Sequence, residues 1–331
     1  MSYMNGINVA FIGFGTVGKG VYETIHSHQK QLHDITGKKV EVSTIVIQNP
    51  DKHQDIQKDI HITTDIQHII NNPAIDVVFE AIVGVEPAYL HIKNCIKAGK
   101  HMITANKEMF ATHGQELKLL AEHYGVALGF DATTAGGIPV IQTIKQLLRV
   151  NQIQKIQAIL NGTSNYILTE MREKQIPFHR ALQQSQDLGY AESDPTNDVE
   201  GFDALFKLMI LSDVSFGKQP LQQHIYRRGI TAIKEEDLRS MQQKRIKHIA
   251  TIEKVNGILT AAVEPLSISE DHPLFSTEGV DNAVHIQTDI VGDLILSGPG
   301  AGALPTASAM IEEFCTFFSQ EQRQADATLS I

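Results

Sequence analysis

The first residues of the chain change from a continuous apolar run to apolar positions at helical spacing. Residues 7–12 form the run, and residues 13–18 contain three glycines. Apolar side chains then recur at helical spacing among polar ones, at Val17, Val21, Ile25 and Leu32. This order predicts a strand, a tight turn and a helix.

Apolar runs alternate with helical patterns through the first half of the chain. The runs that predict strands are 40–47, 76–81, 101–103 and 126–130, with helices expected at 89–98 and 115–123. Continuous apolar runs are typical of strands in a parallel sheet that is covered on both faces. The alternation therefore predicts an α/β fold with a Rossmann-type, doubly wound parallel sheet.

The pattern changes after a predicted helix at 140–148. Strands are expected at 153–160, 258–268, 282–288 and 293–296, where apolar residues alternate or cluster. They predict a second domain of α+β type with its own sheet. The expected domains are 1–139, completed by a C-terminal helix in 303–331, and 140–302. The late helix is expected at 306–318, just past a proline, followed by a polar, loose tail.

The glycines of residues 13–18 have the spacing of a dinucleotide-binding motif. Gly13 is placed to make the tight turn, Gly15 to let the backbone approach a pyrophosphate, and Gly18 to let the helix lie close to its strand. The helix N-terminus adds N–H groups and a positive dipole that favour an anion. Since the motif lies on a strand-to-helix turn, we predict dinucleotide binding here.

The end of the second predicted strand is where such an enzyme commonly carries an acid for NAD or an arginine for NADP. This chain has Gln48 and Asn49 there, with Asp51 as the nearest acid and Lys52 as the nearest cation. The choice between NAD and NADP is therefore left open.

Residues 188–211 predict a buried helix that carries charged residues. Asn197, followed three residues later by a glutamate, is typical of an N-cap with its reciprocal carboxylate, so we predict a helix from about Asp198. The helix that follows has almost no polar face, which indicates burial on most sides. Asp203 and Lys207 are the only charges on its buried part.

Asp203 and Lys207 lie four residues apart and therefore on one face of that helix. A buried ion pair that fixes packing is the simple explanation of the two residues alone. The loop before the helix adds Glu192, Asp194 and Asp198, so one short segment brings four carboxylates and an ammonium together. That is more than packing requires and suits the binding of a small zwitterion, so we predict a site here.

A further lysine follows the predicted strand at 101–103, in the turn Thr104-Ala105-Asn106-Lys107. Ligands of a doubly wound sheet bind beyond the carboxyl ends of its strands. Lys107 is therefore expected to point into the crevice that holds the nicotinamide. The alternative is an ordinary surface lysine.

Two loops of small residues allow more than one interpretation. Residues 131–139 expose backbone carbonyls near one carboxylate, which suits a monovalent cation or a hinge, and the hinge is the simpler interpretation. Residues 298–305 are either a flexible connector or a segment that lays backbone against the cofactor.

Composition narrows the classes of partner. The chain has 331 residues, of which 42% are hydrophobic and 20% charged, with a formal net charge of -10. No basic block offsets this charge, which argues against nucleic acid or an anionic membrane as partner. Cys95 and Cys315 fit no metal or redox spacing, and no apolar run reaches transmembrane length. We therefore expect a cytoplasmic protein.

These motifs together resemble homoserine dehydrogenase, and they occur in that family's order over almost the whole chain. The segments that carry the resemblance are 13–18, 104–107, 135–139, 161–167, 188–207, 300–302 and 304–309. The resemblance implies reversible, NAD(P)-dependent interconversion of L-homoserine and L-aspartate 4-semialdehyde, in threonine, methionine and isoleucine biosynthesis.

The resemblance also implies roles for particular residues. Lys207 is the expected proton donor, Lys107 is expected to share that work, and Asp203 belongs to the same catalytic group. The residues expected at the amino-acid substrate are Glu192, Asp198, Asp203, Tyr190 and Thr163. The residues expected at the cofactor are Gly13, Phe14, Gly15, Thr16, Val17, Gly18, Thr104, Lys107, Gly189, Gly300 and Gly302.

A cation and a partner subunit are implied in the same way. Family members place a sodium-type ion at the loop after the last sheet strand, which here would use the Asp131 carboxylate and the carbonyls of Thr134, Gly136 and Ile138. The usual homodimer forms through the sheets of the second domain, so residues 140–302 are expected to serve both substrate binding and dimerisation.

The chain departs from the family at two places. Many members carry an arginine where this chain has Gln48, and use it for the NADP 2′-phosphate. Many also have a C-terminal regulatory domain of the ACT type. The sequence ends soon after Phe318, so threonine feedback through such a domain is not expected.

The chemistry of the reaction fits Lys207. Reduction of an aldehyde needs a proton for the oxygen on which negative charge builds, and an ammonium at hydrogen-bond distance is both acid and electrostatic stabiliser. Burial lowers the pKa of such a lysine and Asp203 raises it, so the net direction is open at this stage.

Two rival functions remain. Aspartate-semialdehyde dehydrogenase has a similar cofactor domain but needs a thiolate nucleophile. Neither Cys95, among apolar helix positions, nor Cys315, in the late helix, suits that role. A catalytically silent dinucleotide-binding sensor is the rival of another class, and the intact Lys107, Asp203 and Lys207 argue against it.

Overall fold

The computed structural model of the chain describes residues 6–50, 59–147, 149–239 and 243–329. Two compact units divide the chain: one holds the residues up to Thr133 and those from Gly302 on, and the other is Thr134–Ala301. Each unit contains a six-stranded sheet. The chain therefore leaves the first unit once and returns to it near its end.

The sheet of the first unit has the strand order β3-β2-β1-β4-β5-β6, and every neighbouring pair is parallel. Its strands are β1 (Gly6–Ile12), β2 (Lys39–Val46), β3 (His61–Thr63), β4 (Val77–Glu80), β5 (His101–Thr104) and β6 (Leu128–Gly129). This is the strand order of the doubly wound dinucleotide-binding fold, so the predicted fold class is confirmed.

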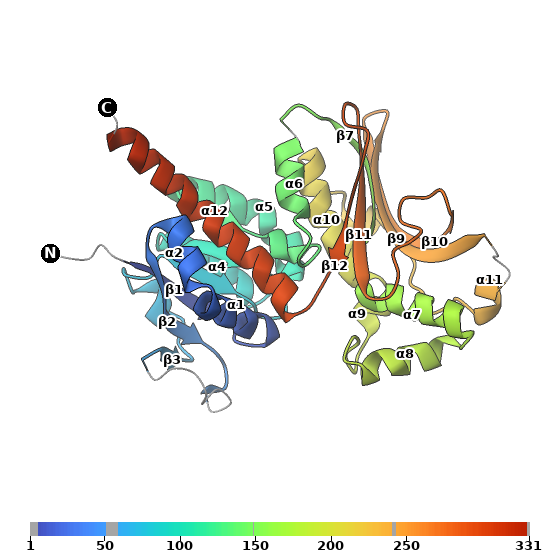
Figure 1. Ribbon diagram of the computed structural model, residues 1–331, viewed down its shortest axis with the longest axis horizontal. Coiled ribbons are helices and arrows are strands. Elements are labelled where there is room, and N and C mark those ends of the chain that lie inside the picture. The colour runs from blue at the N-terminus through green and yellow to red at the C-terminus, as the bar shows by residue number, and fades with distance from the viewer. Residues whose placement is uncertain (1–5, 51–58, 148, 240–242, 330–331) are drawn as a thin grey trace. The chain divides into compact units, whose positions relative to one another are not determined.

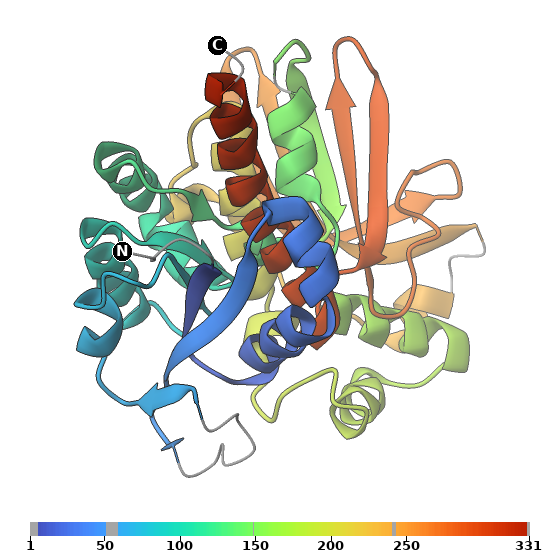
Figure 2. The same ribbon diagram turned by 60° about the vertical axis from the view of Figure 1, so that its left-hand side comes forward.

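The helices of the first unit pack in two groups on either side of this sheet (Figures 1 and 2). One group is α1 (Thr16–Ser27), α2 (Gln29–Thr36) and the last helix, α12 (Ala303–Leu329). The other is α4 (Ala88–Lys97) and α5 (Lys107–Tyr124), with the short α3 (Gln67–Ile70) in contact with α4. Phe314 of α12 lies in the same apolar core as Phe11 and Phe79 of the sheet. The end of the chain is therefore an integral part of the first unit.

Two helices of this unit are longer than predicted. Helix α5 begins at Lys107 because the side chain of Asn106 caps it and accepts a hydrogen bond from the Met109 amide at 3.1 Å. Helix α12 begins at Ala303 and continues to Leu329, so the expectation of a loose tail is wrong for residues 319–329. Those residues are mostly good helix formers such as alanine, glutamate, glutamine and arginine, which extend a helix that packing has already started.

The sheet of the second unit has the order β12-β11-β7-β9-β10-β8 and is antiparallel except for the pair β8 and β10. Its strands are β7 (Ile153–Ile159), β8 (Tyr226–Arg227), β9 (Lys244–Val255), β10 (Ile258–Ser269), β11 (Asp281–Thr288) and β12 (Asp293–Pro299). Strand β9 was not predicted, because the charged and polar residues Lys247 and His248 occupy buried positions in its first half and interrupt the apolar pattern.

The described residues of the second unit form six α-helices, of which α6 and α10 lie side by side (Figure 1). They are α6 (Val140–Leu147), α7 (Gly162–Lys174), α8 (Phe178–Asp187), α9 (Thr196–Val199), α10 (Phe202–Phe216) and α11 (Glu235–Arg239). Helix α7 packs against α8, α9 and α11 and against strand β9. The ends of β7 and α7 are thereby brought next to α9 and α10.

The single helix predicted from about Asp198 is in fact two helices, α9 and α10. They are separated by Gly201, whose φ of 82° lies in the left-handed region. A Cβ there would lie 2.9 Å from Cε1 of His248, so the turn needs the small size of glycine as well.

Asn197 is not the N-cap that the pattern predicted. The helical turn α9 begins at Thr196, so Asn197 lies inside it. Just before the helix, the carboxylate of Asp194 accepts hydrogen bonds from the Thr196 amide at 3.1 Å and from the Thr196 hydroxyl at 2.6 Å. The N-cap position of α9 is Pro195, two residues before Asn197, and its side chain makes no capping hydrogen bond.

Candidate functional site

The turn between β1 and α1 has the geometry of an anion-binding loop. Gly13 has a φ of 90°, and a Cβ there would lie 2.7 Å from the Ala81 carbonyl oxygen. A Cβ at Gly18 would lie 2.6 Å from the Gly13 carbonyl oxygen, whereas a Cβ at Gly15 would meet no atom within 4 Å. Gly13 and Gly18 thus close the turn, and Gly15 leaves room in front of the N-terminus of α1 for a phosphate.

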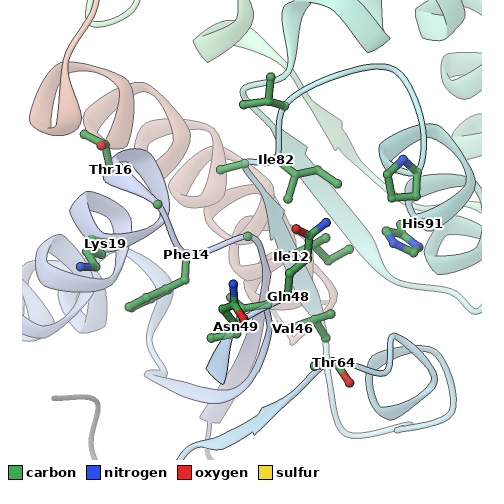
Figure 3. Close-up of a pocket in the computed structure, with 16 residues that line it drawn as sticks. Ile12, Phe14, Thr16, Lys19, Val46, Gln48, Asn49, Thr64, Ile82 and His91 are labelled. Carbon is green, nitrogen blue, oxygen red and sulfur yellow. The ribbon is translucent and has the colours of Figure 1, made fainter. Parts of the chain in front are cut away.

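A pocket of about 900 Å³ opens in front of this turn. Its lining comes from the glycine turn, the end of β2, and the residues that follow β4. In Figure 3, Lys19 and His91 lie on opposite sides of the view, with Gln48 and Asn49 between them. The pocket lies at the carboxyl ends of the strands, where this fold binds dinucleotides.

The predicted contacts of residues 14–17 differ in exposure. Phe14 is 5% exposed and packs edge-on against Phe11 of the core, and it also lines the pocket. Thr16 is exposed at the pocket, and Val17 is half-buried against the core. In this loop, backbone amides and the Thr16 hydroxyl are therefore the groups best placed for a cofactor.

The polar groups at the end of β2 are uncharged. Gln48 and Asn49 line the pocket, while Asp51 and Lys52 lie outside the described residues. Lys19, one turn into α1, is a cation at the pocket that we did not predict. Its position just behind the glycine motif was the available signal.

Thr104 and Lys107 follow β5 at the same edge of the sheet. The Thr104 hydroxyl is buried, donates a hydrogen bond to the Glu80 carboxylate, and accepts one from the Asn106 amide at 3.0 Å. A contact between Thr104 and a cofactor would therefore come through other atoms. Burial raises the pKa of Glu80 to about 7. Lys107 is the first residue of α5, three residues after the end of β5, and is half-buried.

The second unit buries the predicted lysine–carboxylate pair. Lys207 Nζ lies 2.8 Å from Asp203 Oδ2, and the two side chains are 8% and 4% exposed. The ammonium also donates a hydrogen bond to the Leu160 carbonyl at 2.7 Å. The helical spacing thus placed the two residues together as expected, and the end of β7 supplies a further partner.

Asn161 joins the two aspartates of this segment. Its amide nitrogen lies 2.7 Å from Asp198 Oδ1 and 2.9 Å from Asp203 Oδ2. Lys207 and Asp203 therefore belong to a cluster with Asp198 and Asn161, which we call the catalytic cluster because it contains the predicted proton donor. Its one ammonium is outnumbered by two carboxylates.

The other predicted substrate residues lie on the neighbouring loop. The Thr163 hydroxyl donates to the Tyr190 carbonyl at 2.7 Å, and the Tyr190 ring, 45% exposed, packs against Tyr166. Gly189 before it has a φ of 75° and is exposed. The Glu192 carboxylate is exposed and makes no hydrogen bond within the described part of the chain, although its backbone carbonyl accepts one from Gln186. Glu192 is therefore not part of the catalytic cluster.

The two loops of small residues are well packed. Asp131 is buried, and its amide donates to the Glu313 carboxylate at 2.9 Å. In the second unit, a Cβ at Gly136 would lie 2.5 Å from the Gly300 carbonyl group, and a Cβ at Gly300 would collide with the Asn282 side chain. Gly136 and Gly300 are therefore needed for this close approach, whatever else they do.

The remaining residues of these loops are placed as follows. Thr134 and Ile138 are buried, and the Ile138 carbonyl accepts a hydrogen bond from the Val140 amide at 2.7 Å. Gly302 is exposed just before α12. Within the described residues, no group of three His, Cys, Asp or Glu side chains is arranged to hold a metal ion. A sodium ion would therefore depend largely on backbone carbonyls.

Both cysteines are unsuited to covalent catalysis. Cys95 is fully buried, and burial raises its pKa to about 12. Burial likewise raises the pKa of Cys315 to about 11. A thioester mechanism needs a thiolate near neutral pH, so the rival assignment to aspartate-semialdehyde dehydrogenase loses its nucleophile. No helix in the described ranges is long and apolar enough to cross a membrane.

The first unit has a doubly wound sheet with a glycine turn and a pocket, and the second unit has a buried lysine–carboxylate cluster. Together these features define a dinucleotide-dependent oxidoreductase. A family model for homoserine dehydrogenase matches residues 139–314, and a model for the homoserine dehydrogenase NAD binding domain matches residues 13–131. The chain belongs to the homoserine dehydrogenase family, whose enzymes are NAD(P)-dependent oxidoreductases.

Individual relatives agree with the family models. Homoserine dehydrogenase of Lactococcus lactis is 37% identical over 323 residues, which are 96% of this chain and 75% of that protein. The crystal structure of a homoserine dehydrogenase from Thiobacillus denitrificans is 36% identical with a TM-score of 0.92, covering 96% of this chain and 74% of that one. A hyperthermophilic archaeal homoserine dehydrogenase in complex with NADPH is 28% identical with a TM-score of 0.80, over 93% and 96% of the two chains. The predicted function and enzyme class are confirmed.

Proposed function

We propose that Lys207 is the proton donor when the enzyme reduces L-aspartate 4-semialdehyde to L-homoserine, and the proton acceptor in reverse. The observation that carries this proposal is the buried ammonium between Asp203 Oδ2 and the Leu160 carbonyl. Two acceptors at 2.8 Å and 2.7 Å favour the charged, proton-bearing form of a lysine that burial alone would discharge.

The proton balance of the reaction gives Lys207 and Asp203 their roles. When bound, the nicotinamide supplies a hydride in reduction and accepts one in oxidation. As the aldehyde carbon gains the hydride, its oxygen takes a proton from Lys207 Nζ, and solvent then restores the proton. Asp203 holds the ammonium in place and stabilises its charge.

The substrate ammonium is the reason for the surplus of carboxylates. We assign its recognition to Glu192 and Asp198, and the rest of the substrate pocket to Asp203, Tyr190 and Thr163. Glu192 is exposed, so a substrate can reach its carboxylate. Glu192→Gln should raise KM for homoserine roughly tenfold with little change in kcat, since an ammonium contact exists equally in ground and transition states. An unchanged KM would remove Glu192 from the site.

The cofactor contacts that we assign in the first unit are the turn of residues 13–18 and Lys107. We also assign cofactor contacts to Gly189, Gly300 and Gly302, on the basis of the family resemblance. The open space at Gly15 and the pocket in front of it fit a pyrophosphate. A Gly15→Val variant should lose dinucleotide binding, because its side chain would occupy the space for the pyrophosphate. The fold should be unaffected, since a Cβ at this position meets no protein atom within 4 Å. Titration of nicotinamide fluorescence measures the binding.

Both NADP(H) and NAD(H) are proposed as cofactors, with a modest preference for NADP(H). Discrimination against NADPH needs a carboxylate at the ribose, and the pocket end of β2 presents Gln48 and Asn49 instead. The NADPH complex of an archaeal relative is consistent with this choice. A preference for NADH above about a hundredfold, worth roughly 2.7 kcal/mol, would contradict it.

A sodium ion at residues 131–138 is also proposed. It rests on the family resemblance and on the buried Asp131 carboxylate that precedes a loop of small residues. Activity in sodium chloride should exceed activity in choline chloride at equal ionic strength. Equal activity in the two salts would count against the ion.

We infer a homodimer formed through the sheet of the second unit. Val255, Ile258 and Ile295 on its strands are 48%, 67% and 48% exposed, and they offer apolar surface that a partner subunit would cover. An Ile295→Lys variant should shift the mass measured by light scattering from dimer to monomer. A monomeric wild-type protein would contradict the inference.

A cytoplasmic location is proposed on the basis of cysteine chemistry. Cys95 and Cys315 are free and buried, which fits a reducing compartment. Cell fractionation of the native protein tests this directly, and recovery from an oxidising compartment would contradict it.

The experiment that tests the proposed chemistry is a steady-state assay of the reduced nicotinamide with homoserine. Lys207→Ala and Lys107→Ala are compared with wild type. If Lys207 is the donor, its variant loses far more kcat than the Lys107 variant.

A further inference from the structure

Asn161 occupies the position between β7 and α7. It is 6% exposed, and both hydrogen-bond donors of its amide are used on carboxylates. The nitrogen lies 2.7 Å from Asp198 and 2.9 Å from Asp203. A single neutral side chain therefore bridges the two acids of the catalytic cluster.

The orientation of this amide is determined by its other end. The Asn161 oxygen accepts hydrogen bonds from the Ser164 amide and from the Ser164 hydroxyl, both at 2.7 Å. A backbone N–H can only donate, so the atom that faces it must be the oxygen. The nitrogen is thereby directed at the carboxylates, which can only accept when ionised.

Asn161 is linked to Lys207 through Asp203. Asp203 Oδ2, which accepts from Asn161, also lies 2.8 Å from Lys207 Nζ. The residue before Asn161 is Leu160, whose carbonyl accepts from the same ammonium. The two consecutive residues that follow β7 therefore hold the ammonium and its counter-ion in one arrangement.

Electrostatics explains why a neutral donor is needed at this place. Asp198 and Asp203 are brought close to one nitrogen atom, and two neighbouring carboxylates disfavour each other's ionised form. A donor shared between them favours the ionised form of both. An ionised Asp203 is in turn what holds Lys207 in its charged form.

We propose that Asn161 is a positioning residue for catalysis, which keeps Asp198 and Asp203 ionised and oriented and thereby aligns Lys207. This inference rests on the proposed role of Lys207 as proton donor. Asn161 also caps helix α7 through its oxygen, so a test must separate the amide nitrogen from the cap.

Asn161→Ser and Asn161→Asp separate the two roles. Both side chains retain an oxygen that caps a helix well, and both lack the NH2 group. We expect kcat to fall roughly tenfold to a hundredfold in Asn161→Ser, which is the scale of a small misplacement of a catalytic group. The fall should be greater in Asn161→Asp, because a third carboxylate joins the cluster.

The pH profile is the readout that a purely structural role would not move. Without the shared donor, the two aspartates take up protons more readily, so the acid limb of the kcat profile should shift to higher pH in both variants. The dissociation constant for NADPH should stay at the wild-type value, because the glycine turn and pocket lie in the other unit.

Thr169→Val is the matched control. Thr169 lies in α7, the helix that Asn161 caps; it is buried and donates a hydrogen bond to Glu278 rather than to the catalytic cluster. It should lose stability with no shift of the acid limb. Lys207→Ala in the same series tests the proposed function itself: if it keeps full turnover, the role of Lys207 fails first.

Two outcomes overturn the inference about Asn161 while leaving Lys207 in place. One is an Asn161→Ser enzyme with wild-type kcat and an unmoved acid limb. The other is an Asn161→Ser enzyme that loses kcat, after correction for the folded fraction, but keeps the acid limb of its pH profile at the wild-type pH. An unmoved acid limb is also what we expect of the control Thr169→Val, so the loss would then be purely structural. If Asn161→Ser does not fold, Asn161→Asp decides by the same two measurements.

Discussion

The second unit contains two buried lysines, each paired with a carboxylate, and they differ in the sign of the surrounding charge. Lys207 and Asp203 share their cluster with Asp198, so carboxylates outnumber the ammonium. Lys247 is paired with Glu278, on which two arginines also converge, so cations outnumber the carboxylate. The first arrangement complements a substrate that carries an ammonium, and the second does not.

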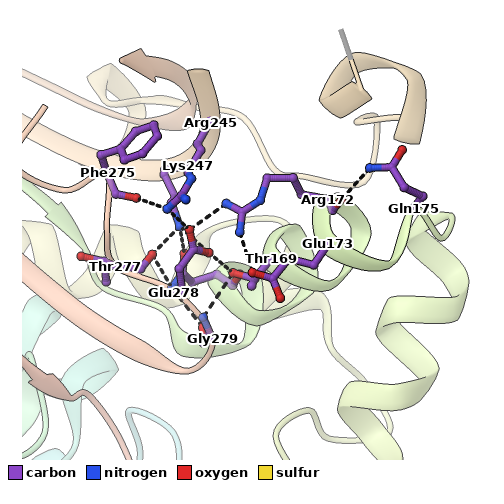
Figure 4. A network of polar contacts seen from close by, with 11 residues as sticks. Thr169, Arg172, Glu173, Gln175, Arg245, Lys247, Phe275, Thr277, Glu278 and Gly279 are labelled. Atoms are coloured by element: carbon purple, nitrogen blue, oxygen red, sulfur yellow. Dashed lines mark hydrogen bonds and ion pairs between the residues drawn. The ribbon is translucent and has the colours of Figure 1, made fainter. Parts of the chain in front are cut away.

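The Lys247 cluster joins elements of the fold (Figure 4). Lys247 Nζ lies 3.0 Å from Glu278 and also donates to the Thr277 carbonyl and to Asn165 of helix α7. Arg172 of α7 and Arg245 of β9 bond the same glutamate. These contacts fasten the loop before β11 to α7 and β9.

The comparison shows that a buried lysine–carboxylate pair does not identify a catalytic site by itself. Both lysines are almost inaccessible, at 7% for Lys207 and 1% for Lys247. The surplus charge and the neighbouring exposed loop distinguish them. We therefore expect chemistry to depend on Lys207 and stability to depend on Lys247.

The largest expected effect is the loss of kcat on replacing Lys207. Lys207→Ala should lower kcat by roughly ten-thousandfold, since it removes the acid and the charge that stabilises the developing alkoxide. NADPH binding should remain nearly intact. Lys207→Arg, which retains charge but is a poor acid, should also be slow, and a fully active arginine variant would show that charge alone suffices.

Replacing Lys247 should instead lower the free energy of unfolding. Lys247→Met fills a similar volume but leaves Glu278 and the Thr277 carbonyl with fewer partners, so a loss of roughly 3 kcal/mol is expected. Arg172 and Arg245 still bond the glutamate and limit the damage. Urea unfolding measures this, and an unchanged midpoint would contradict the structural role.

Replacing the acid partners, Asp203 and Glu278, should separate activity from stability in the same way as replacing the two lysines. Asp203→Asn keeps the shape of the side chain but removes the counter-ion of Lys207, so kcat should fall roughly a hundredfold. Glu278→Gln should leave kcat within about twofold and reduce stability. Similar losses of kcat in both variants would remove the distinction between the clusters.

The smallest expected effect is a pH dependence of stability. Burial lowers the pKa of Lys247 to about 8 from an ordinary value near 10.5. Between these two pH values the unfolded lysine binds a proton that the folded one has lost, so this group makes stability rise with pH from about 8 to 10.5. The difference in unfolding free energy between wild type and Lys247→Met should therefore grow by on the order of 1–3 kcal/mol over this range. A constant difference would contradict the lowered pKa.

The sequence predicted the Lys207 pair because both residues lie on one helix, where a spacing of four residues places them together. It could not predict the Lys247 pair, since Lys247 and Glu278 lie on separate elements and meet only through tertiary packing. Asn161 was recognised only as part of a turn, because its bonds to Asp198 and Asp203 depend on the approach of α9 and α10 to the end of β7.

The fold was predicted with unequal success for a similar reason. The parallel sheet was evident because its buried strands are continuous apolar runs. Strand β9 was missed because it carries the buried Lys247, whose charge is offset only by residues distant in sequence. The break at Gly201 was missed because it depends on the nearby His248 ring.

The most direct test of the central claim is the single-turnover rate of hydride transfer in Lys207→Met and Lys247→Met. Both variants are measured with saturating NADPH and aspartate semialdehyde, at a temperature where both are folded. The account predicts a fall of roughly ten-thousandfold for Lys207→Met and a rate within about tenfold of wild type for Lys247→Met. Equal falls in the two variants, or a greater fall in Lys247→Met, would contradict the assignment of chemistry to Lys207.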